Sequence, residues 1–163
     1  MSTNTWYPPR WAGRPRQMPV TDWAVWRAWL ARHGHEYEAF AYDVELFSTA
    51  VVPTTSDQTW AEFWMRAASK RIDAVGRRRG RWTLFEARRR AGWQSVGQLI
   101  GYRQLWPNDY PTKPLEDAWL LTDTIDPAIA NVAITNGLKI WTPSVPGTTL
   151  AVEEATIAAG PAN

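Results

Sequence analysis

Residues 71 to 106 have the sequence RIDAVGRRRGRWTLFEARRRAGWQSVGQLIGYRQLW, and packing alone does not explain its charged residues. An apolar run ends at Asp73, a tight turn is expected over residues 76 to 80, and an alternating run extends from Trp82 to Arg88. The short RRRG segment favours a hairpin, so the two runs predict a pair of antiparallel strands. A helix is expected to follow.

The alternation in the second strand predicts which side chains share a face. Successive side chains of a strand point to opposite sides, so Glu86 and Arg88 should lie on one face with Trp82 and Leu84. Antiparallel pairing would bring Asp73 near Glu86. Two carboxylates at one edge of a sheet favour a hard divalent cation, which prefers oxygen ligands and also binds phosphate oxygens.

These residues resemble the motifs of the PD-(D/E)XK nuclease superfamily, and the resemblance covers roughly residues 22 to 142. It implies an α/β fold with a core of helix, three strands, helix and strand, in which a central mixed β-sheet is flanked by helices. Three segments match the family motifs: Arg71-Ile72-Asp73 at the metal-binding aspartate, Glu86-Ala87-Arg88 at the (D/E)XK tripeptide, and Gln98 to Tyr102 at the QxxxY helix motif of the RecB-like branch.

The resemblance implies a catalytic set of Asp73, Glu86, Arg88, Gln98 and Tyr102, in which Asp73 and Glu86 bind Mg²⁺ or Mn²⁺ if the site is intact. The family has lysine where this chain has Arg88. Arginine stays protonated and suits phosphate, but it cannot act as a base. A metal ion bound by the two carboxylates could itself lower the pKa of water, so both retained and lost hydrolysis stay open.

The motif helix also allows a packing interpretation. Ser95 and Gln98 have the spacing of a capping box, and Tyr102 recurs at helical spacing with Leu99 and Trp106.

Ile72 replaces the family's proline, which the RecB-like branch tolerates.

Seven arginines lie between Arg77 and Arg90, with one acid, Glu86, among them. So dense a group of cations repels itself at low salt, and a polyanion or an acidic partner would relieve this repulsion. A solvated hairpin without a ligand is the alternative. Beside Arg88, the arginines predicted to contact DNA phosphates are Arg77, Arg78, Arg79, Arg81, Arg89 and Arg90.

The chain of 163 residues is expected to contain an N-terminal arm (1–20), a nuclease-like α/β domain (21–142) and a C-terminal arm (143–163). Within the domain, hydrophobic spacing and capping residues predict six further elements. These are a helix from Thr21 to near Gly34, a strand over 40–47, a helix opened by Thr59, a buried strand over 118–122, and a helix capped by Asp126 and ended by Gly137 before a last strand over 138–141.

Composition excludes several classes of site. The chain has no cysteine, which removes disulfides and thiolate zinc sites, and its net charge of +2 hides the local arginine cluster. His33 and His35, with Glu36 and Glu38 nearby, allow a metal interpretation but lack further ligands of recognisable spacing. We expect no membrane partner and no export signal, hence a location in a virion or in the host cytoplasm.

Two functions follow. Short stand-alone chains of this pattern resemble tailed-phage gene products, which implies a structural component of a phage particle, near DNA at the head-to-tail junction, with weakened or lost catalysis. The two arms suit contacts with other subunits, and we expect a homo-oligomer. The alternative is an active Mg²⁺-dependent DNA nuclease.

Overall fold

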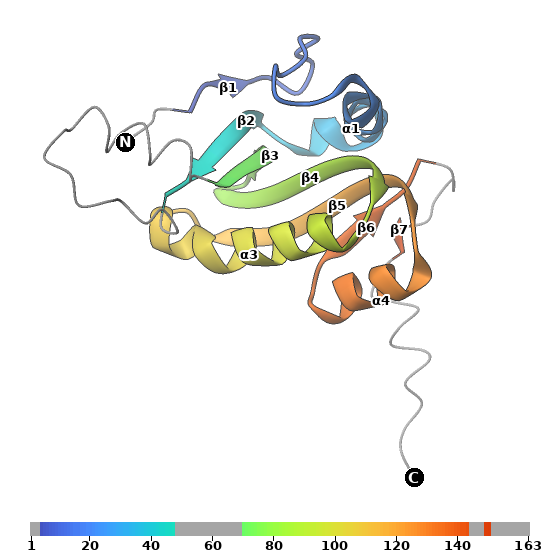
Figure 1. Ribbon diagram of the computed structural model, residues 1–163. Coiled ribbons are helices and arrows are strands. Elements are labelled where there is room, and N and C mark those ends of the chain that lie inside the picture. Colours follow the sequence, from blue (N-terminus) through green and yellow to red (C-terminus); the bar gives the residue numbers. More distant parts are fainter. Residues whose placement is uncertain (1–3, 48–69, 144–148, 151–163) are drawn as a thin grey trace, which may run out of the picture.

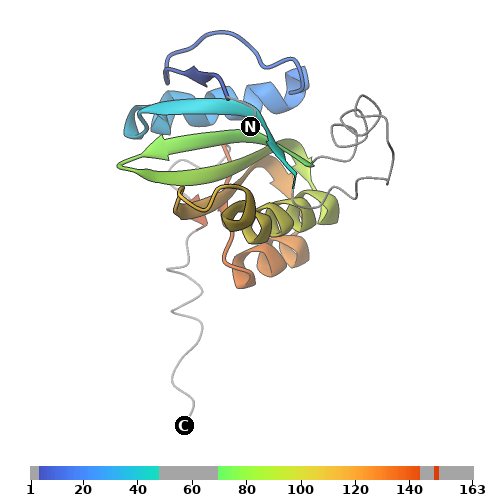
Figure 2. The same cartoon turned by 90° about the vertical axis from the view of Figure 1, so that its left-hand side faces the viewer.

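A computed structural model describes residues 4–47 and 70–143 and the backbone of 149–150. The protein is an α/β protein built on a mixed sheet (Figure 1). Helix α1 covers one face of the sheet, and helices α3 and α4 cover the other (Figures 1 and 2). The prediction of a central mixed sheet flanked by helices is confirmed.

The strands lie in the sheet in their chain order. Neighbours from β1 to β4 pair antiparallel, β4 with β5 and β5 with β6 pair parallel, and β6 with β7 pair antiparallel. The strands are β1 (Trp6–Tyr7), β2 (Ala39–Leu46), β3 (Lys70–Arg78), β4 (Arg81–Ala91), β5 (Leu115–Ile125), β6 (Lys139–Trp141) and β7 (Thr149–Leu150).

The helices sit where this topology needs them. Parallel neighbours require a crossover connection, and α3 (Trp93–Asp109) and α4 (Pro127–Thr135) supply the two crossovers. Helix α1 (Val20–His33) continues into a 3₁₀ turn, η1 (Gly34–Glu36), which leads into β2. The helix predicted from Thr21 is therefore confirmed.

The β3–β4 hairpin is also confirmed, but its turn is tighter than predicted. Arg79 and Gly80 both have positive φ, 50° and 72°, as in a two-residue hairpin turn. Gly76 lies inside β3 and not in the turn. A Cβ there would come within 2.9 Å of ring atoms of Tyr37 and Phe40, so close packing explains this glycine.

A tryptophan stripe on α1 forms the core on its face of the sheet, as its spacing predicts. Trp26 is fully buried and meets Phe40 and Phe85 edge-on, at ring distances of 5.3 and 5.2 Å. On the opposite face, Leu99 and Trp106 of α3 are also buried. The sheet thus has two separate apolar layers, with the candidate site at the margin between them.

Helix α3 differs from its predicted form at its start. It begins at Trp93 after Gly92, so the predicted capping box is not formed and Ser95 is buried in the first turn. It continues through Pro107 to Asp109 because a proline near the end removes few helical hydrogen bonds.

In α4 the expected caps are present. The Asp126 carboxylate accepts a hydrogen bond from the Ala128 N–H at 2.8 Å, and Gly137 has a φ of 74° just after the helix.

The N-terminal segment, expected as an arm, packs against the sheet where the structure describes it. Trp6–Tyr7 forms an edge strand, which is too short to show alternation in the sequence. Met18 is only 2% exposed. The helix predicted from Thr59 and most of the C-terminal arm lie outside the described residues. Across the described ranges, no helix has the length and apolar character needed to cross a membrane.

Candidate functional site

Four charged residues from three elements meet where α1 begins, near the carboxyl end of β4. Asp22 lies in the first turn of α1, Asp73 in β3, and Glu86 and Arg88 in β4. The pairing of β3 with β4 ends at Ala74 and Phe85, one step before Asp73 and Glu86 would face each other. The predicted proximity of Asp73, Glu86 and Arg88 is thus present in the structure.

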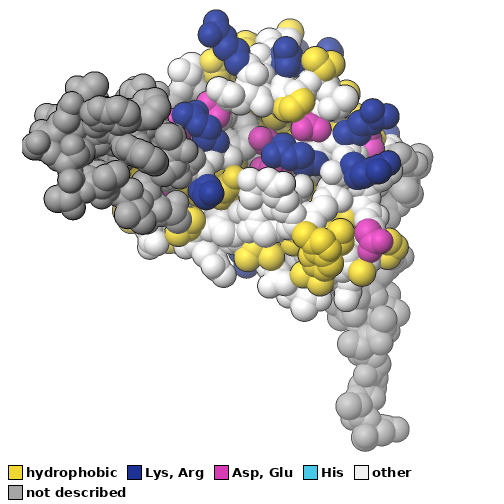
Figure 3. All heavy atoms as spheres, in the orientation of Figure 1, with side chains coloured by type: hydrophobic (Ala, Val, Ile, Leu, Met, Phe, Trp, Pro, Cys, Tyr) yellow, Lys and Arg dark blue, Asp and Glu magenta, His cyan; other side chains and the backbone are white. Residues whose placement is uncertain are grey.

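The Arg88 guanidinium lies among all three carboxylates. Its Nη1 donates to Asp73 Oδ2 at 2.8 Å and lies 3.5 Å from Asp22 Oδ2. Its Nη2 lies 2.5 Å from Glu86 Oε1. In Figure 3, acidic and basic side chains lie side by side on the face between α1 and α3. One cation is therefore set against three anions.

Backbone groups of β4 hold two of the carboxylates in place. The Ala87 N–H donates to Asp73 Oδ2 at 3.0 Å, and the Arg89 N–H donates to Asp22 Oδ1 at 2.8 Å. Charge-assisted bonds from backbone amides fix the direction of a carboxylate. Asp22 and Asp73 are thus positioned by the strand that carries Glu86 and Arg88.

Glu86 is the least satisfied member of the site. Its side chain is 1% exposed, and neither carboxylate oxygen receives a well-directed hydrogen bond from any group in the described residues. The Arg88 contact is close but lies off the direction of a good hydrogen bond. Burial, and then the charge of Asp73, raise the pKa of Glu86 to about 8.

Two further side chains, Asp73 and Tyr102, also have raised pKa values. Burial raises the pKa of the Asp73 carboxyl, although Arg88 opposes this shift. Tyr102 of α3 is buried, and burial and then the Glu86 carboxylate raise the pKa of its phenol. Gln98 lies one turn earlier on α3, and its Oε1 is buried without a donor among the described residues. Within the described residues, the Gln98 side chain makes no hydrogen bond to Asp22, Asp73, Glu86 or Arg88.

Asp22 was not predicted from the sequence. An acid in the first turn of a helix is common because it complements the helix dipole, so its position gave no sign of a site. Its burial, at 7% exposure, is the unusual feature, because ionised aspartates are seldom so buried without partners.

The seven arginines do not form one patch. Arg77 pairs with Glu38 at 3.0 Å, and Arg78 pairs with both Glu36 and Glu116 at 3.0 Å. From Arg81 to Arg88, β4 covers about 23 Å at ~3.3 Å per residue, which separates the hairpin end from the site end.

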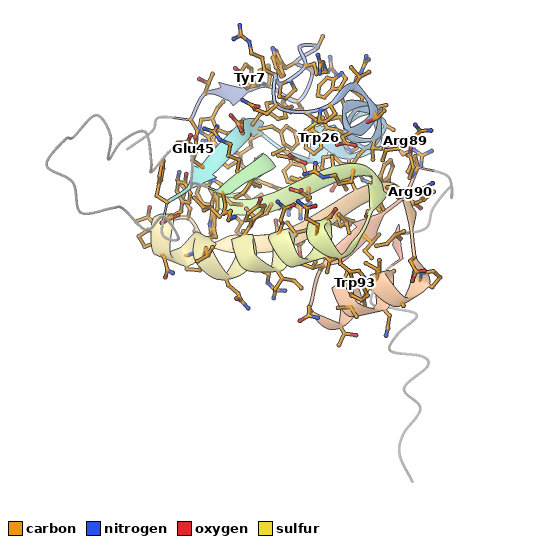
Figure 4. All side chains as sticks on the ribbon, viewed as in Figure 1. Tyr7, Trp26, Glu45, Arg89, Arg90 and Trp93 are labelled. Carbon is orange, nitrogen blue, oxygen red and sulfur yellow. The ribbon has the colours of Figure 1, made fainter. Side chains whose placement is uncertain are left out.

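Arg89 and Arg90, at the site end, are exposed and make no side-chain ion pair within the described residues (Figure 4). Near the turn, Arg79 and Arg81 are exposed too. The predicted phosphate contacts therefore divide into paired arginines and exposed ones.

The side chains of the alternative metal site, His33 and His35 with Glu36 and Glu38, do not converge on one point in the structure. His33 Nδ1 lies 2.9 Å from Glu36 Oε1, while Glu38 pairs with Arg77. His35 is exposed. Among the described residues, no group of three His, Cys, Asp or Glu side chains is arranged to hold a metal ion.

In donor type, the charged site still fits a divalent cation. Asp22, Asp73 and Glu86 offer carboxylate oxygens, the ligands that Mg²⁺ and Mn²⁺ prefer, and both Glu86 oxygens lack a hydrogen-bond donor in the described part of the chain. In this arrangement, the Arg88 guanidinium lies between the carboxylates.

Comparison of the chain with protein-family models, with curated proteins and with solved structures found no match.

Proposed function

We propose that the chain is a nuclease-fold protein of the PD-(D/E)XK type in which the Arg88 guanidinium takes the position of the catalytic cation. Phosphodiester hydrolysis is then weakened or lost. Support comes from the element order: α1, the antiparallel strands β2 to β4, α3 and the parallel strand β5 follow the order that the resemblance implies.

The observation that carries this proposal is the placement of Arg88 among three carboxylates. A lysine at this position can lose its proton and approach a water molecule, whereas a guanidinium cannot act as a base. A guanidinium held by Asp73 and Glu86 also competes directly with a metal ion for their oxygens. Arg88 therefore offsets part of the negative charge of the carboxylates without a metal ion, but it cannot supply the base that hydrolysis needs.

We further propose that the protein is a structural component of a tailed-phage particle, near DNA at the head-to-tail junction. Arg89 and Arg90 beside the site are exposed and make no ion pair within the described residues, which suits contact with phosphates. Contacts with other subunits and copies of the chain would involve the arms. Weak catalysis is compatible with such a role, because assembly needs surfaces and not turnover.

An active Mg²⁺-dependent DNA nuclease is the second candidate, and Glu86 favours it. A buried carboxylate that receives no hydrogen bond within the described residues, and whose pKa is raised to about 8, is suited to accepting another cation. A divalent ion, when bound, would lower the pKa of a water molecule and polarise the phosphate. Asp73 and Glu86 would hold the ion, and Arg88, once displaced, would be free to contact a phosphate oxygen.

Cleavage of duplex DNA in Mg²⁺ or Mn²⁺ by wild type and Arg88→Lys separates the two candidates. If the missing lysine is what disables the site, Arg88→Lys should cleave at least about 100-fold faster than wild type, the lower range for a positioned acid or base. The double variant Arg88→Lys with Glu86→Ala should not cleave.

A wild type that cleaves as fast as Arg88→Lys would favour the active nuclease and contradict weakened catalysis. If neither protein cleaves, calorimetry with Mn²⁺ tests whether the oxygens bind a metal at all. Binding by Arg88→Lys that is lost on adding Asp73→Ala would show a metal site without turnover. No binding by any variant would assign the fold to architecture alone.

A further inference from the structure

A recess lies at the edge of the sheet, beside β1 and β2, and none of the four charged residues of the site lines it. Its volume is about 350 Å³, within the lower range of small-molecule sites. Tyr7 and Glu45, both labelled in Figure 4, belong to its lining. Residues from the N-terminal segment, β2 and β3 form its walls, chiefly Tyr7, Trp11, Arg16, Gln17, Tyr42 and Arg71.

Three half-buried aromatic rings form one wall of the recess. The Tyr7 and Trp11 rings are 4.2 Å apart, and Trp11 and Tyr42 are 5.3 Å apart, with interplanar angles of 32° and 34°. The Tyr42 hydroxyl accepts a hydrogen bond from Trp26 Nε1 at 3.3 Å, which ties the wall to the buried core. Such a cluster presents a rigid aromatic surface at low cost in side-chain entropy.

The polar lining is balanced in charge. Arg71 donates to Asp43 at 2.5 Å and to Glu45, so its guanidinium is already paired with carboxylates. Arg16 adds a second cation, which gives two positive and two negative groups around the recess. A neutral aromatic group with polar edges fits this lining better than a phosphate does.

The recess adjoins the charged site through neighbouring strands. Asp43 in β2 and Asp73 in β3 both lie between the paired positions Tyr42–Ala74 and Val44–Ile72, where the positive φ of Asp43, 54°, interrupts the regular pairing. Neighbouring strands are about 4.8 Å apart. A single strand could place a base in the recess and a phosphate farther along the strand near Arg89 and Arg90, beside the charged site.

We propose that the recess binds an unpaired nucleobase of single-stranded DNA. The inference rests on the proposed function, because it takes the exposed Arg89 and Arg90, beside the charged site, as the groups that meet the phosphates. A base within a duplex is stacked on both faces and paired along its edge, so it cannot enter a recess of this size unless it is unpaired. Stacking on Tyr7, Trp11 and Tyr42 supplies binding that tolerates any base sequence, while the exposed Gln17 amide can reach a base edge.

Fluorescence anisotropy in EDTA and low salt tests the proposal, with a labelled thymidine strand of about 12 nucleotides, within the range that one small domain covers, and a duplex of equal length as probes. Trp11→Ala should weaken binding of the single strand about tenfold, the loss typical of one stacked base, and leave duplex binding unchanged. Trp11→Phe keeps a ring and should retain most of the affinity.

Trp93→Ala is the matched control. Trp93 is 60% exposed and lies far from Tyr7 in Figure 4, so its loss should not change single-strand binding. A Trp93→Ala loss as large as that of Trp11→Ala, or equal losses for strand and duplex, would overturn the recess while leaving the proposed function intact. A wild type that binds neither probe would overturn both.

Gln17→Ala is a second variant of the recess, which keeps the test valid if Trp11→Ala does not fold properly. Gln17 is exposed at the rim, so its removal spares the core, and the loss of one hydrogen bond should weaken single-strand binding about threefold. If thermal unfolding shows Trp11→Ala to be destabilised, this variant decides the test. Unchanged binding by Gln17→Ala would then overturn the proposal.

Discussion

Two arginine–carboxylate clusters, one at the hairpin end of the sheet and one at the candidate site, have similar partners but very different surroundings. Arg78 contacts Glu36 and Glu116 at 3.0 Å, and these three side chains are 27% to 37% exposed. At the site, Arg88 contacts three carboxylates that are 16% exposed or less. The clusters thus differ in access to water and in the balance of charge.

Because of this difference in exposure, the hairpin cluster is an ordinary surface ion pair, whereas the Arg88 cluster is a candidate functional site. Water and salt screen the hairpin cluster, and exposed pairs of this kind contribute little to stability. At the site, burial and then the neighbouring carboxylates raise the pKa of Glu86, and the buried negative charge opposes folding at high pH. Proteins commonly keep such an arrangement where a cation, a proton or a substrate is to be bound.

Removing the central cation should have the largest effect. Arg88→Ala leaves Asp22, Asp73 and Glu86 without a cation, so the free energy of unfolding should fall by about 3 kcal/mol near pH 8, as when one partner of a buried pair is removed. Urea denaturation measures the loss. Mg²⁺ or Mn²⁺ should restore part of it if the oxygens accept a metal ion.

Arg90→Ala is the matched control for this prediction. It removes the same charge from the same strand, but Arg90 is exposed and makes no ion pair within the described residues, so its loss should cost less than about 0.5 kcal/mol. If Arg88→Ala and Arg90→Ala lower the free energy of unfolding equally, the buried position of Arg88 does not contribute to stability.

The second prediction concerns the pH dependence of stability. The pKa of Glu86 is raised to about 8 in the folded protein, above its ordinary value of 4.5, so the folded state holds a proton that the unfolded state releases. Stability from this proton is complete below pH 4.5 and is lost as the pH rises towards 8. Because one proton is involved, the slope is at most about 1.4 kcal/mol per pH unit.

Glu86→Gln should flatten this dependence and make the protein more stable than wild type at pH 8 to 9. Asp73, whose pKa burial also raises, would leave a smaller slope. Glu116→Gln makes the same charge change in the exposed cluster and should leave the curve as in wild type. Urea unfolding at several pH values checks both, and parallel curves for wild type and Glu86→Gln would show that Glu86 does not hold the proton.

Local patterns predicted most of the fold. The tryptophan spacing of α1, the alternation in β4 and the Asp126 cap each involve neighbours in sequence, and all three are present in the structure. Errors arose where tertiary contacts decided the outcome. Gly76 lies in a strand because aromatic rings pack against it, and α3 begins before Ser95.

The site was only half predictable for the same reason. A hairpin joins Asp73 to Glu86, so sequence alone could place them together, as the structure does. Asp22 arrives from a helix more than fifty residues earlier, and only the packing of α1 against β4 brings it to Arg88. The prediction of one arginine cluster was wrong for the opposite reason. The seven arginines are close in sequence, but the extended strand β4 separates them in space.

The smallest effect is expected at the hairpin cluster. In a double-mutant cycle with Arg78→Ala and Glu116→Ala, the coupling free energy should be about 0.5 kcal/mol, since both side chains keep contact with water. It should fall further in 1 M salt, where the screening length is only about 3 Å. The equivalent cycle with Arg88→Ala and Asp73→Ala should give a larger coupling that changes little with salt, because the Asp73 carboxylate is shielded and also fixed by the Ala87 N–H. Equal salt sensitivity in the two cycles would show that water reaches both clusters alike, and the physical basis for singling out the Arg88 site would be lost.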